Sequence, residues 1–590
     1  MKINTLELHN YRAFYRTHTI SVDGKSMLIY GENGSGKSSL YKAVEDLFAA
    51  ANQSKSIAAN IFDGNSPYVK VIMDSGESFI YQNDNTSPVP TPNFLIETHR
   101  HNPFFTYKRL LRAYLAENDA KRPDIFSILI ETVLPYHTNR KSGQTFREEW
   151  SDINNALKLN ASTNKYKQVR NLTLPNFNNG LDAFLQDLAN RTNNWLTQYF
   201  NHHVEIAFNE PNLSIRKEGS NKIIADKEIT LTLKYFNASI PDNYYEFLNE
   251  ARLSALTVCM YLASLKIIPE PQNYKILFLD DIFIGLDMSN RIPLLEILKD
   301  NFSDFQIFLT TYDRYWFEVA KDWFECKDKA LWSFLEMYAD DAAGFEIPHI
   351  IPAKGYLKKA EDYIVSHDYP AAGMYLRKQC ERVLTNLLKP AYRVKEVSLD
   401  EKTKNYKTEQ KKLNDLIIGL KNFCQDENLS YANFENLAIY KDALLNPLSH
   451  HDTETPIYKA ELQAIMDVLK QLESIRIIEL PSTRNKDFIL RLEKSDGTFF
   501  AIEFRTGESI LLIKEPSGSA RLLHYCKCEQ KSIDNNGSRQ NERKSFDSLY
   551  TLYHDVCLRF NVPEQDDILY VIKLRGKSLH DMIAEQLPNA

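Results

Sequence analysis

Alternating apolar and polar residues predict a group of short strands at the start of the chain. The runs that show this alternation are residues 3–8, 20–22, 68–73 and 78–82. A period of two places one face of each run in a core and the other face in solvent. The run from Met27 to Tyr30 is apolar throughout, which is typical of a strand buried on both faces.

From about residue 100 to residue 205 the apolar spacing changes to that of helices. Leu181, Phe184, Leu185 and Leu188 fall on one face of such a helix. The pattern does not sustain heptads long enough for an extended coiled coil, so we expect a compact helical insertion. The insertion interrupts an α/β domain that we place at residues 1–345.

The second half of the chain predicts two smaller domains. Pro348, Pro352 and Gly355 mark a boundary near residue 350. Residues 346–478 read as an all-α domain, and residues 479–590 read as a small α+β domain. The strands expected in the last domain are residues 488–492, 499–504 and 510–514. The polar stretch 532–545 after them predicts a loop.

Composition narrows the broad class of the protein. The chain has 590 residues, of which 43% are hydrophobic and 25% charged, as is ordinary for a globular protein. No apolar stretch approaches the length of a membrane span, and the N-terminus lacks a signal-peptide pattern. Seven scattered cysteines fit a reducing compartment, so we expect a cytoplasmic protein. The net charge of −7 gives no global support for nucleic-acid binding, which would need a local basic patch.

The clearest chemical motif follows the apolar run that ends at Tyr30. It reads Gly-Glu-Asn-Gly-Ser-Gly-Lys-Ser-Ser over residues 31–39 and precedes a helical pattern. A strand, a glycine-rich loop and a helix in this order form a P-loop, which binds the phosphates of a nucleoside triphosphate. Lys37 adds a positive charge, and the Ser38 hydroxyl is a ligand for Mg²⁺. The residues predicted to bind the nucleotide are Gly31, Asn33, Gly34, Ser35, Gly36, Lys37, Ser38 and Ser39.

A second motif supplies two carboxylates. Residues 276–279 form a short apolar run that predicts a buried strand, and Asp280 and Asp281 follow directly. This is a Walker B pattern, in which Asp280 holds Mg²⁺ together with Ser38. Asp281 is the candidate that orients or deprotonates the attacking water.

The order of these motifs resembles the ABC-type ATPase heads of the SMC, RecF and OLD superfamily. The resemblance covers about residues 1–335 and rests on the P-loop, on the insertion and on residues 10–14, 248–252, 280–281 and 285–287. It implies ATP and Mg²⁺ as ligands. It also implies a homodimer of heads that sandwiches ATP, in which each head presents a signature helix to the P-loop of the other.

Within this resemblance the signature helix opens with Leu-Asn-Glu-Ala-Arg over residues 248–252. Asn249 replaces the serine that contacts the γ-phosphate of the partner head, and its side chain can still donate a hydrogen bond. Glu250 stands at a glycine position. Asp287 matches the D-loop aspartate. The catalytic set implied by the resemblance is Lys37, Asn249, Asp281 and Asp287.

Three further positions depart from the pattern of the family. Asp281 stands where most ABC ATPases carry glutamate, which predicts slow hydrolysis. No histidine follows the apolar run 306–310, so either Tyr312 or Asp313 occupies the switch position. Gln82 is a weak candidate for the Q-loop glutamine.

A different set of residues lies in the second half. Arg377 and Glu381 are spaced to share one helix face, and His450 ends an Asn-x-x-x-His pattern some seventy residues later. This set resembles HEPN helical ribonucleases, in particular the ABC-linked anticodon nucleases of the PrrC and RloC type. The resemblance implies His450 as acid or base, Arg377 as phosphate clamp and Glu381 as its partner. An ordinary ion pair between Arg377 and Glu381, with His450 as a helix cap, explains the same residues.

The sequence therefore leads to three hypotheses. In the first, an ATPase of bacterial anti-phage defence controls a ribonuclease in its own chain that attacks tRNA. In the second, the chain is a scaffold of the PtuA type that restrains a separate partner nuclease such as an HNH protein. In the third, it is a RecF-like DNA-repair ATPase. All three expect ATP, Mg²⁺ and a head dimer, and they differ in the nucleic acid and the partner.

Overall fold

A computed structural model describes most of the chain. The described residues are 1–108, 125–218, 221–227, 229–240, 247–341, 344–399, 406–427, 429–440, 458–494, 496–515, 521–523, 526–564 and 568–586. The chain divides into two compact units, residues 1–353 and residues 354–590. None of the helices within these ranges combines the length and apolar character needed to cross a lipid bilayer.

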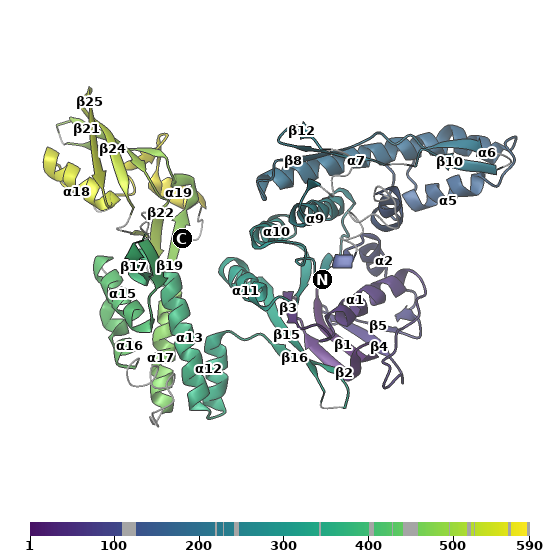
Figure 1. Cartoon of the computed structure of the whole chain (residues 1–590), viewed down its shortest axis with the longest axis horizontal. Helices are drawn as coiled ribbons and strands as arrows, with labels where there is room; N and C mark the ends of the chain where they lie inside the picture. The colour runs from purple at the N-terminus through teal and green to yellow at the C-terminus, as the bar shows by residue number, and fades with distance from the viewer. Residues whose placement is uncertain are drawn as a thin grey trace. The chain divides into compact units, whose positions relative to one another are not determined.

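A six-stranded sheet forms the centre of the first unit (Figure 1). Its strands, in spatial order, are β16 (Ile347–Pro352), β15 (Trp332–Asp340), β3 (Ser26–Gly31), β14 (Gln306–Thr311), β13 (Ile276–Asp280) and β7 (Phe104–Thr106). Every neighbouring pair is parallel except β15 and β16. The strands β3, β13 and β14 are buried along their whole length. β16 extends the first unit past the boundary expected at residue 345.

Helices cover both faces of this sheet because each has an apolar stripe to bury. Helix α1 (Lys37–Asn52) buries Leu40, Val44 and Leu47 against one face. The other face packs against helices α9 (Glu250–Ile267), α10 (Met288–Asn301) and α11 (Arg314–Asp328). Since α1 follows β3, α10 follows β13 and α11 follows β14, all three helices begin at the carboxyl edge of the sheet.

An antiparallel sheet packs on the outer side of α1. Its strands, in order, are β2 (Phe14–Ser21), β1 (Ile3–Tyr11), β4 (Tyr68–Met73), β5 (Ser78–Gln82) and β6 (Asn85–Ser87), and helix α2 (Asn93–Arg100) packs on α1. The buried Gln306 amide joins this sheet to the parallel one. It accepts a hydrogen bond from Ile3 N at 2.7 Å and donates to Ile3 O and Lys25 O, each at 2.9 Å.

The insertion begins after β7 and is helical in its first part. Its described helices are α4 (Ile125–Ser127), η1 (Ile128–Val133), α5 (Phe146–Ala156), α6 (Asn164–Gln168), η2 (Val169–Thr173) and α7 (Leu174–Gln198). The strands β8 (Val204–Phe208), β9 (Ser214–Glu218), β10 (Asn221–Ala225), β11 (Leu231–Tyr235) and β12 (Ala238–Ser239) follow. β8 packs on α7, the longest helix of the insertion (Figure 1).

The second unit opens with helices, as the apolar spacing predicts. They are α12 (Tyr356–Val365), α13 (Tyr369–Leu387), α14 (Pro390–Arg393), α15 (Leu413–Asp426), η4 (Tyr431–Phe434), α16 (Glu435–Tyr440) and α17 (Lys459–Ser474). Their apolar faces share one core. A hairpin of β17 (Val394–Leu399) and β18 (Tyr406–Gln410) interrupts them, so this part is not purely helical.

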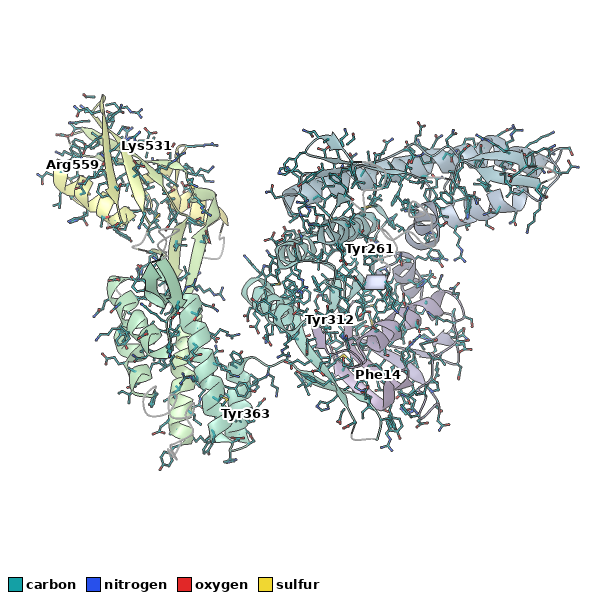
Figure 2. The ribbon with its side chains drawn as sticks, viewed as in Figure 1. Phe14, Tyr261, Tyr312, Tyr363, Lys531 and Arg559 are labelled. Carbon is teal, nitrogen blue, oxygen red and sulfur yellow. The ribbon has the colours of Figure 1, made fainter. Side chains whose placement is uncertain are left out.

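The last part of the chain is built on strands. A three-stranded sheet of β19 (Arg476–Leu480), β22 (Ile510–Lys514) and β23 (Arg521–Leu522) contacts the helical core through Ile513 and Leu523. A six-stranded sheet contains β25 (Ser538–Phe546), β24 (Cys528–Asn535), β21 (Phe499–Thr506), β20 (Asp487–Glu493), β26 (Ile572–Leu574) and β27 (Lys577–Ser578). Helices α18 (Leu549–Phe560) and α19 (Leu579–Gln586) pack on it, and Figure 2 labels Arg559 on α18 and Lys531 on β24.

The loop predicted over residues 532–545 is wrong, because this stretch forms much of the hairpin β24–β25. Within this stretch Ser532 and Ile533 of β24 are buried, whereas residues 538–545 of β25 are exposed except for the half-buried Glu542. A strand that is exposed on both faces has no apolar alternation by which it can be recognised.

Candidate nucleotide-binding site

The P-loop connects β3 to α1 at the carboxyl edge of the parallel sheet. Gly36 is the N-cap of α1 and has a φ of 95°, a left-handed conformation that costs glycine little. A Cβ on Gly31 would lie 2.4 Å from Ser35 Oγ, so the loop folds this closely only because residue 31 is glycine. The first N–H groups of α1 have no acceptor within the helix. Loop and helix together form a site for phosphate.

Lys37 supplies a positive charge inside the loop. Its Nζ donates hydrogen bonds to Gly31 O at 2.6 Å and to Glu32 O at 3.0 Å. Burial lowers the pKa of Lys37, and the negative charges of Asp281, Asp280 and Glu32 oppose this shift. These carboxylates favour an ammonium that stays charged beside the phosphate site.

The two predicted Mg²⁺ ligands meet in the structure. Ser38 Oγ donates to Asp280 Oδ2 at 3.3 Å, although the residues are 242 positions apart in the chain. Thr310 holds the second oxygen, because its Oγ1 donates to Asp280 Oδ1 at 2.7 Å. The register of β13 and β14 places Leu279 beside Leu309, which brings Thr310 next to Asp280.

Asp281 lies beside this pair and has an unusual environment. Its backbone φ is 53°, and its N–H donates to Thr310 Oγ1 at 3.0 Å. Burial and then the charge of Asp280 raise the pKa of Asp281 to about 6, while Lys37 and the Tyr312 backbone act in the opposite direction. Asp281 Oδ1 is buried and has no hydrogen-bond partner among the described residues. An acceptor of this kind suits the abstraction of a proton from water.

The donor set fits a magnesium nucleotide. A hydroxyl and a carboxylate are the hard oxygen ligands that Mg²⁺ takes alongside phosphate and water. Burial also raises the pKa of Asp280, and the hydrogen bonds from Thr310 and Ser38 and the charge of Lys37 oppose this shift. A divalent cation at Ser38 and Asp280 would offset the negative charge of Asp280 and Asp281.

Helix α9, which the sequence predicts to be the signature helix, begins beside the turn that follows β13, where Ser254 of α9 lies against Gly285. Asn249 is its N-cap, and Asn249 Oδ1 accepts from Arg252 N at 3.0 Å. Since the carbonyl end of the side chain is engaged, the amide Nδ2 is the end that can donate to a phosphate. Asn249 and Glu250 are both exposed.

Asp287 is likewise the N-cap of its helix, α10. Its Oδ1 accepts from Asn290 N at 3.0 Å, Asn290 Nδ2 at 2.8 Å and Ser289 Oγ at 2.8 Å. The D-loop aspartate predicted to act in catalysis therefore has a structural role within its own chain, since capping satisfies N–H groups that the helix leaves unpaired.

The two candidates for the switch position, Tyr312 and Asp313, differ in the surroundings of their side chains. Both oxygens of Asp313 are engaged, because Oδ1 accepts from Trp316 N at 3.0 Å and Oδ2 accepts from Arg291 Nη1 at 2.6 Å. Tyr312 is 43% exposed and lies where β14 passes into α11 (Figure 2). Of the two residues, Tyr312 is the one whose side chain faces outward.

Gln82 lies at the end of β5 in the antiparallel sheet, paired with Asn85. The edge strand β7 instead brings Thr106 beside Asp280. Sequence reasoning missed Thr106 and Thr310, which share one signal: each is a polar residue at or near the end of a short apolar run. Arg291 was also missed, and no sequence pattern marks it.

The second predicted site is only partly described. Arg377 Nε and Glu381 Oε1 are 3.3 Å apart on α13, as an i,i+4 pair. Their side chains are 24% and 43% exposed, respectively. His450 lies outside the described residues.

Comparisons with known proteins bear on the first unit. Residues 1–88, which contain the P-loop, match the model of the AAA ATPase domain family. The match includes the P-loop and ends before β13, the strand that precedes Asp280. No curated protein matches the chain.

Several solved structures are similar at low identity. The SMC head domain from Thermotoga maritima is 13% identical, with a TM-score of 0.27, and the match covers 60% of this chain and 100% of that one. An Smc head domain derived from Pyrococcus furiosus, bound to the C-terminal domain of ScpA, is 12% identical, with a TM-score of 0.33 and coverages of 61% and 99%. The recombination mediator RecF with ATP is 15% identical, with a TM-score of 0.36 and coverages of 60% and 98%.

Proposed function

We propose that the chain is an ATP-hydrolysing switch of the SMC/RecF-like ABC type, in which nucleotide pairs the heads of two copies. The observation that carries the proposal is the contact of Ser38 with Asp280 at 3.3 Å, with Asp281 adjacent. It joins a phosphate loop, a cation site and a base at one sheet edge. The family match to an ATPase domain over residues 1–88 supports the same assignment.

Each residue of the candidate site has a defined task in this reaction. The P-loop N–H groups and Lys37 bind and orient the phosphates, and Ser38 and Asp280 would hold Mg²⁺, which would supply Lewis-acid stabilisation of the phosphate charge. Asp281 Oδ1 orients the attacking water and accepts its proton. Thr310 holds the Asp280 carboxylate and the Asp281 backbone in place through its two hydrogen bonds.

A second copy of the chain is the partner that the sheet edge favours. Large apolar side chains are exposed there, beside the starts of α9, α10 and α11: Phe247 at 61%, Met288 at 40%, Tyr312 at 43% and Tyr315 at 69%. A face that gathers apolar groups around a polar site is typical of an interface. In the dimer, Asn249 Nδ2 and the D-loop of one head would face the nucleotide of the other.

The test combines hydrolysis and assembly in the full-length protein. Phosphate release with Mg²⁺ and ATP is measured for the wild type, Lys37→Ala and Asp281→Asn, with Arg216→Met as the control, because Arg216 pairs with Asp226 on an exposed hairpin. We expect activity in the wild type and control only. Light scattering should show dimers of Asp281→Asn with ATP and monomers of Lys37→Ala. A wild type without Mg²⁺-dependent hydrolysis would contradict the proposal.

The output of the switch is a narrower proposal. We infer control of a nuclease in anti-phage defence, with Arg377, Glu381 and His450 as an in-chain ribonuclease. The alternatives are a separate partner nuclease and a RecF-like role on DNA. Growth and tRNA integrity are compared in cells expressing the wild type, Asp281→Ala, and Asp281→Ala with His450→Ala. Cleavage lost only in the double variant supports the in-chain nuclease, and intact tRNA throughout contradicts it.

A further inference from the structure

Arg291 joins two loops that flank the candidate site. Its Nε donates to Leu286 O at 2.8 Å, and its Nη1 donates to Asp313 Oδ2 at 2.6 Å. The guanidinium also lies 5.4 Å from the centroid of the Trp316 ring. The side chain is only 12% exposed, so water competes little for these contacts.

The first loop reached by Arg291 is the D-loop, residues 285–287. Leu286 contributes its carbonyl to Arg291, and the next residue, Asp287, caps α10. Arg291 lies in the first turn of that same helix. A shift of the D-loop therefore moves the hydrogen-bond acceptor of Arg291 directly.

The second loop is the connection from β14 to α11, which we take together with the last two residues of β14 as the segment 310–313. Asp313 anchors its far end, because one oxygen caps α11 and the other bonds Arg291. Thr310 anchors its near end on Asp280 and on the Asp281 N–H. Between these anchors the backbone of Tyr312 faces the Asp281 carboxylate. The position of this segment therefore determines the position of the candidate base.

We propose that Arg291 is a positioning residue for ATP hydrolysis, which ties the D-loop to the segment 310–313 and thereby holds Asp281 in its working position. The inference rests on the proposed ATPase and dimer. Because the D-loop faces the second head in that dimer, head pairing and hydrolysis are coupled through the Arg291 side chain.

The chemistry of arginine suits this task. Its planar guanidinium presents donors in fixed and separate directions, so one side chain bonds a carbonyl and a carboxylate at once. Lysine carries the same charge on a single flexible ammonium. Arg291→Lys should keep the pair with Asp313 and lose the bond to Leu286 O.

The experiment separates nucleotide binding from chemistry in the full-length protein. Arg291→Met, Arg291→Lys, Asp313→Asn and the double variant Arg291→Met with Asp313→Asn are compared with the wild type and with the control Arg216→Met. The measured quantities are kcat, KM, the Kd of a non-hydrolysable ATP analogue and the melting temperature. Asp313→Asn keeps the size and the helix-capping ability of the side chain and removes only its charge.

We expect kcat of Arg291→Met to fall roughly 10- to 100-fold, the range typical of a misplaced catalytic group. The Kd of the analogue should stay at the value of the control, whereas the melting temperature should fall, because Arg291→Met leaves the Leu286 carbonyl and the Asp313 carboxylate without this donor. Arg291→Lys should recover part of kcat, and the double variant should be no slower than the slower single variant, because both changes break one contact.

Three results would overturn the inference. One is an unchanged kcat in Arg291→Met. Another is a loss of kcat that is matched by an equal weakening of the analogue Kd and is not partly recovered in Arg291→Lys, which would mean a structural role alone. The third is a double variant in which the two losses multiply. A wild type that does not hydrolyse ATP overturns this inference together with the proposed function, whereas an active wild type and an equally active Arg291→Met overturn only the inference.

Discussion

Ser38 and Asp280 are 242 residues apart and meet in one hydrogen bond, whereas Arg377 and Glu381 are four residues apart and pair along one helix. The first contact exists only because β3 and β13 lie in the same sheet, with β14 between them. The second follows from helix geometry alone, since any such i,i+4 pair lies on one face. A contact that needs the whole fold is stronger support for a built site than one that a single helix provides.

The first of these two sites is also the more deeply buried. Asp280 is 6% exposed and shares its oxygens with Ser38 and Thr310, while Glu381 is 43% exposed. Burying a carboxylate is costly unless hydrogen bonds or a cation compensate. Asp280, at the carboxyl edge of the parallel sheet, bears this cost, whereas the partly exposed Glu381 on α13 does not. The following changes test the comparison, from the largest expected effect to the smallest.

The largest effect should come from Asp280→Asn. The amide keeps the size of the side chain and removes the charge that we propose to hold Mg²⁺, so hydrolysis should fall by at least about 100-fold. Phosphate release at saturating Mg²⁺ and ATP measures it. Arg377→Gln, tested in parallel, should leave this rate at the wild-type value. An equal loss in both variants would remove the distinction between the two sites.

Thr310→Val should have the next largest effect. It removes the hydroxyl that donates to Asp280 and accepts from Asp281 N, while the volume of the side chain is kept. Leaving these buried groups unpaired should cost about 1–3 kcal/mol of unfolding free energy. Urea unfolding of the first unit measures the loss, and kcat should fall with it. Full stability and full activity would show that Thr310 is dispensable.

Gly285→Ala tests the packing of the D-loop on the signature helix. A Cβ at this position would lie 2.2 Å from Ser254 Oγ and 3.1 Å from Ser254 Cβ, both on α9. Relief of this overlap should destabilise the unit by about 1–3 kcal/mol. Adding Ser254→Gly removes both atoms and should restore part of the melting temperature. If adding Ser254→Gly does not raise the melting temperature of Gly285→Ala, the contact between residue 285 and Ser254 is not the cause of the loss.

The smallest effect should come from breaking the Arg377–Glu381 pair. Glu381→Gln should change the unfolding free energy of the second unit by only about 0.2–0.5 kcal/mol, because the pair is partly exposed and screened by salt. Chemical denaturation in low and high salt measures this. A loss several times larger would mean that the pair belongs to a more buried network, and the comparison would then need revision.

In the candidate nucleotide-binding site, the sequence predicts the residues proposed to bind or react better than the residues that hold them in position. Lys37, Ser38, Asp280 and Asp281 stand in short motifs whose meaning depends on neighbours in the chain. Arg291 stands in no such motif, and its partner Asp313, 22 residues away, comes beside it only because β13 and β14 are neighbours in the sheet. Short sequence motifs reveal the residues proposed to bind the ligand, whereas the residues that hold them in position are revealed only by the tertiary structure.

The fold follows the same rule. The apolar strands β3, β13 and β14 are visible in the sequence because all their positions are buried. The strand β7 is only three residues long, too short for any periodicity, yet it places Thr106 beside Asp280. The small sheets of the insertion were missed in part because strands such as β9 are largely exposed and lack an apolar face.

The backbone at Asp281 limits which acid this position accepts. Its φ of 53° lies in the left-handed region, which aspartate and asparagine enter more readily than longer side chains do, because they can hydrogen-bond locally. A glutamate here would add a methylene group and a strain of about 1 kcal/mol to the turn. The shorter acid is therefore chosen by the shape of the main chain as well as by its reaction with water. Asparagine, which shares that shape, is consequently the substitution that removes the base while leaving the turn intact.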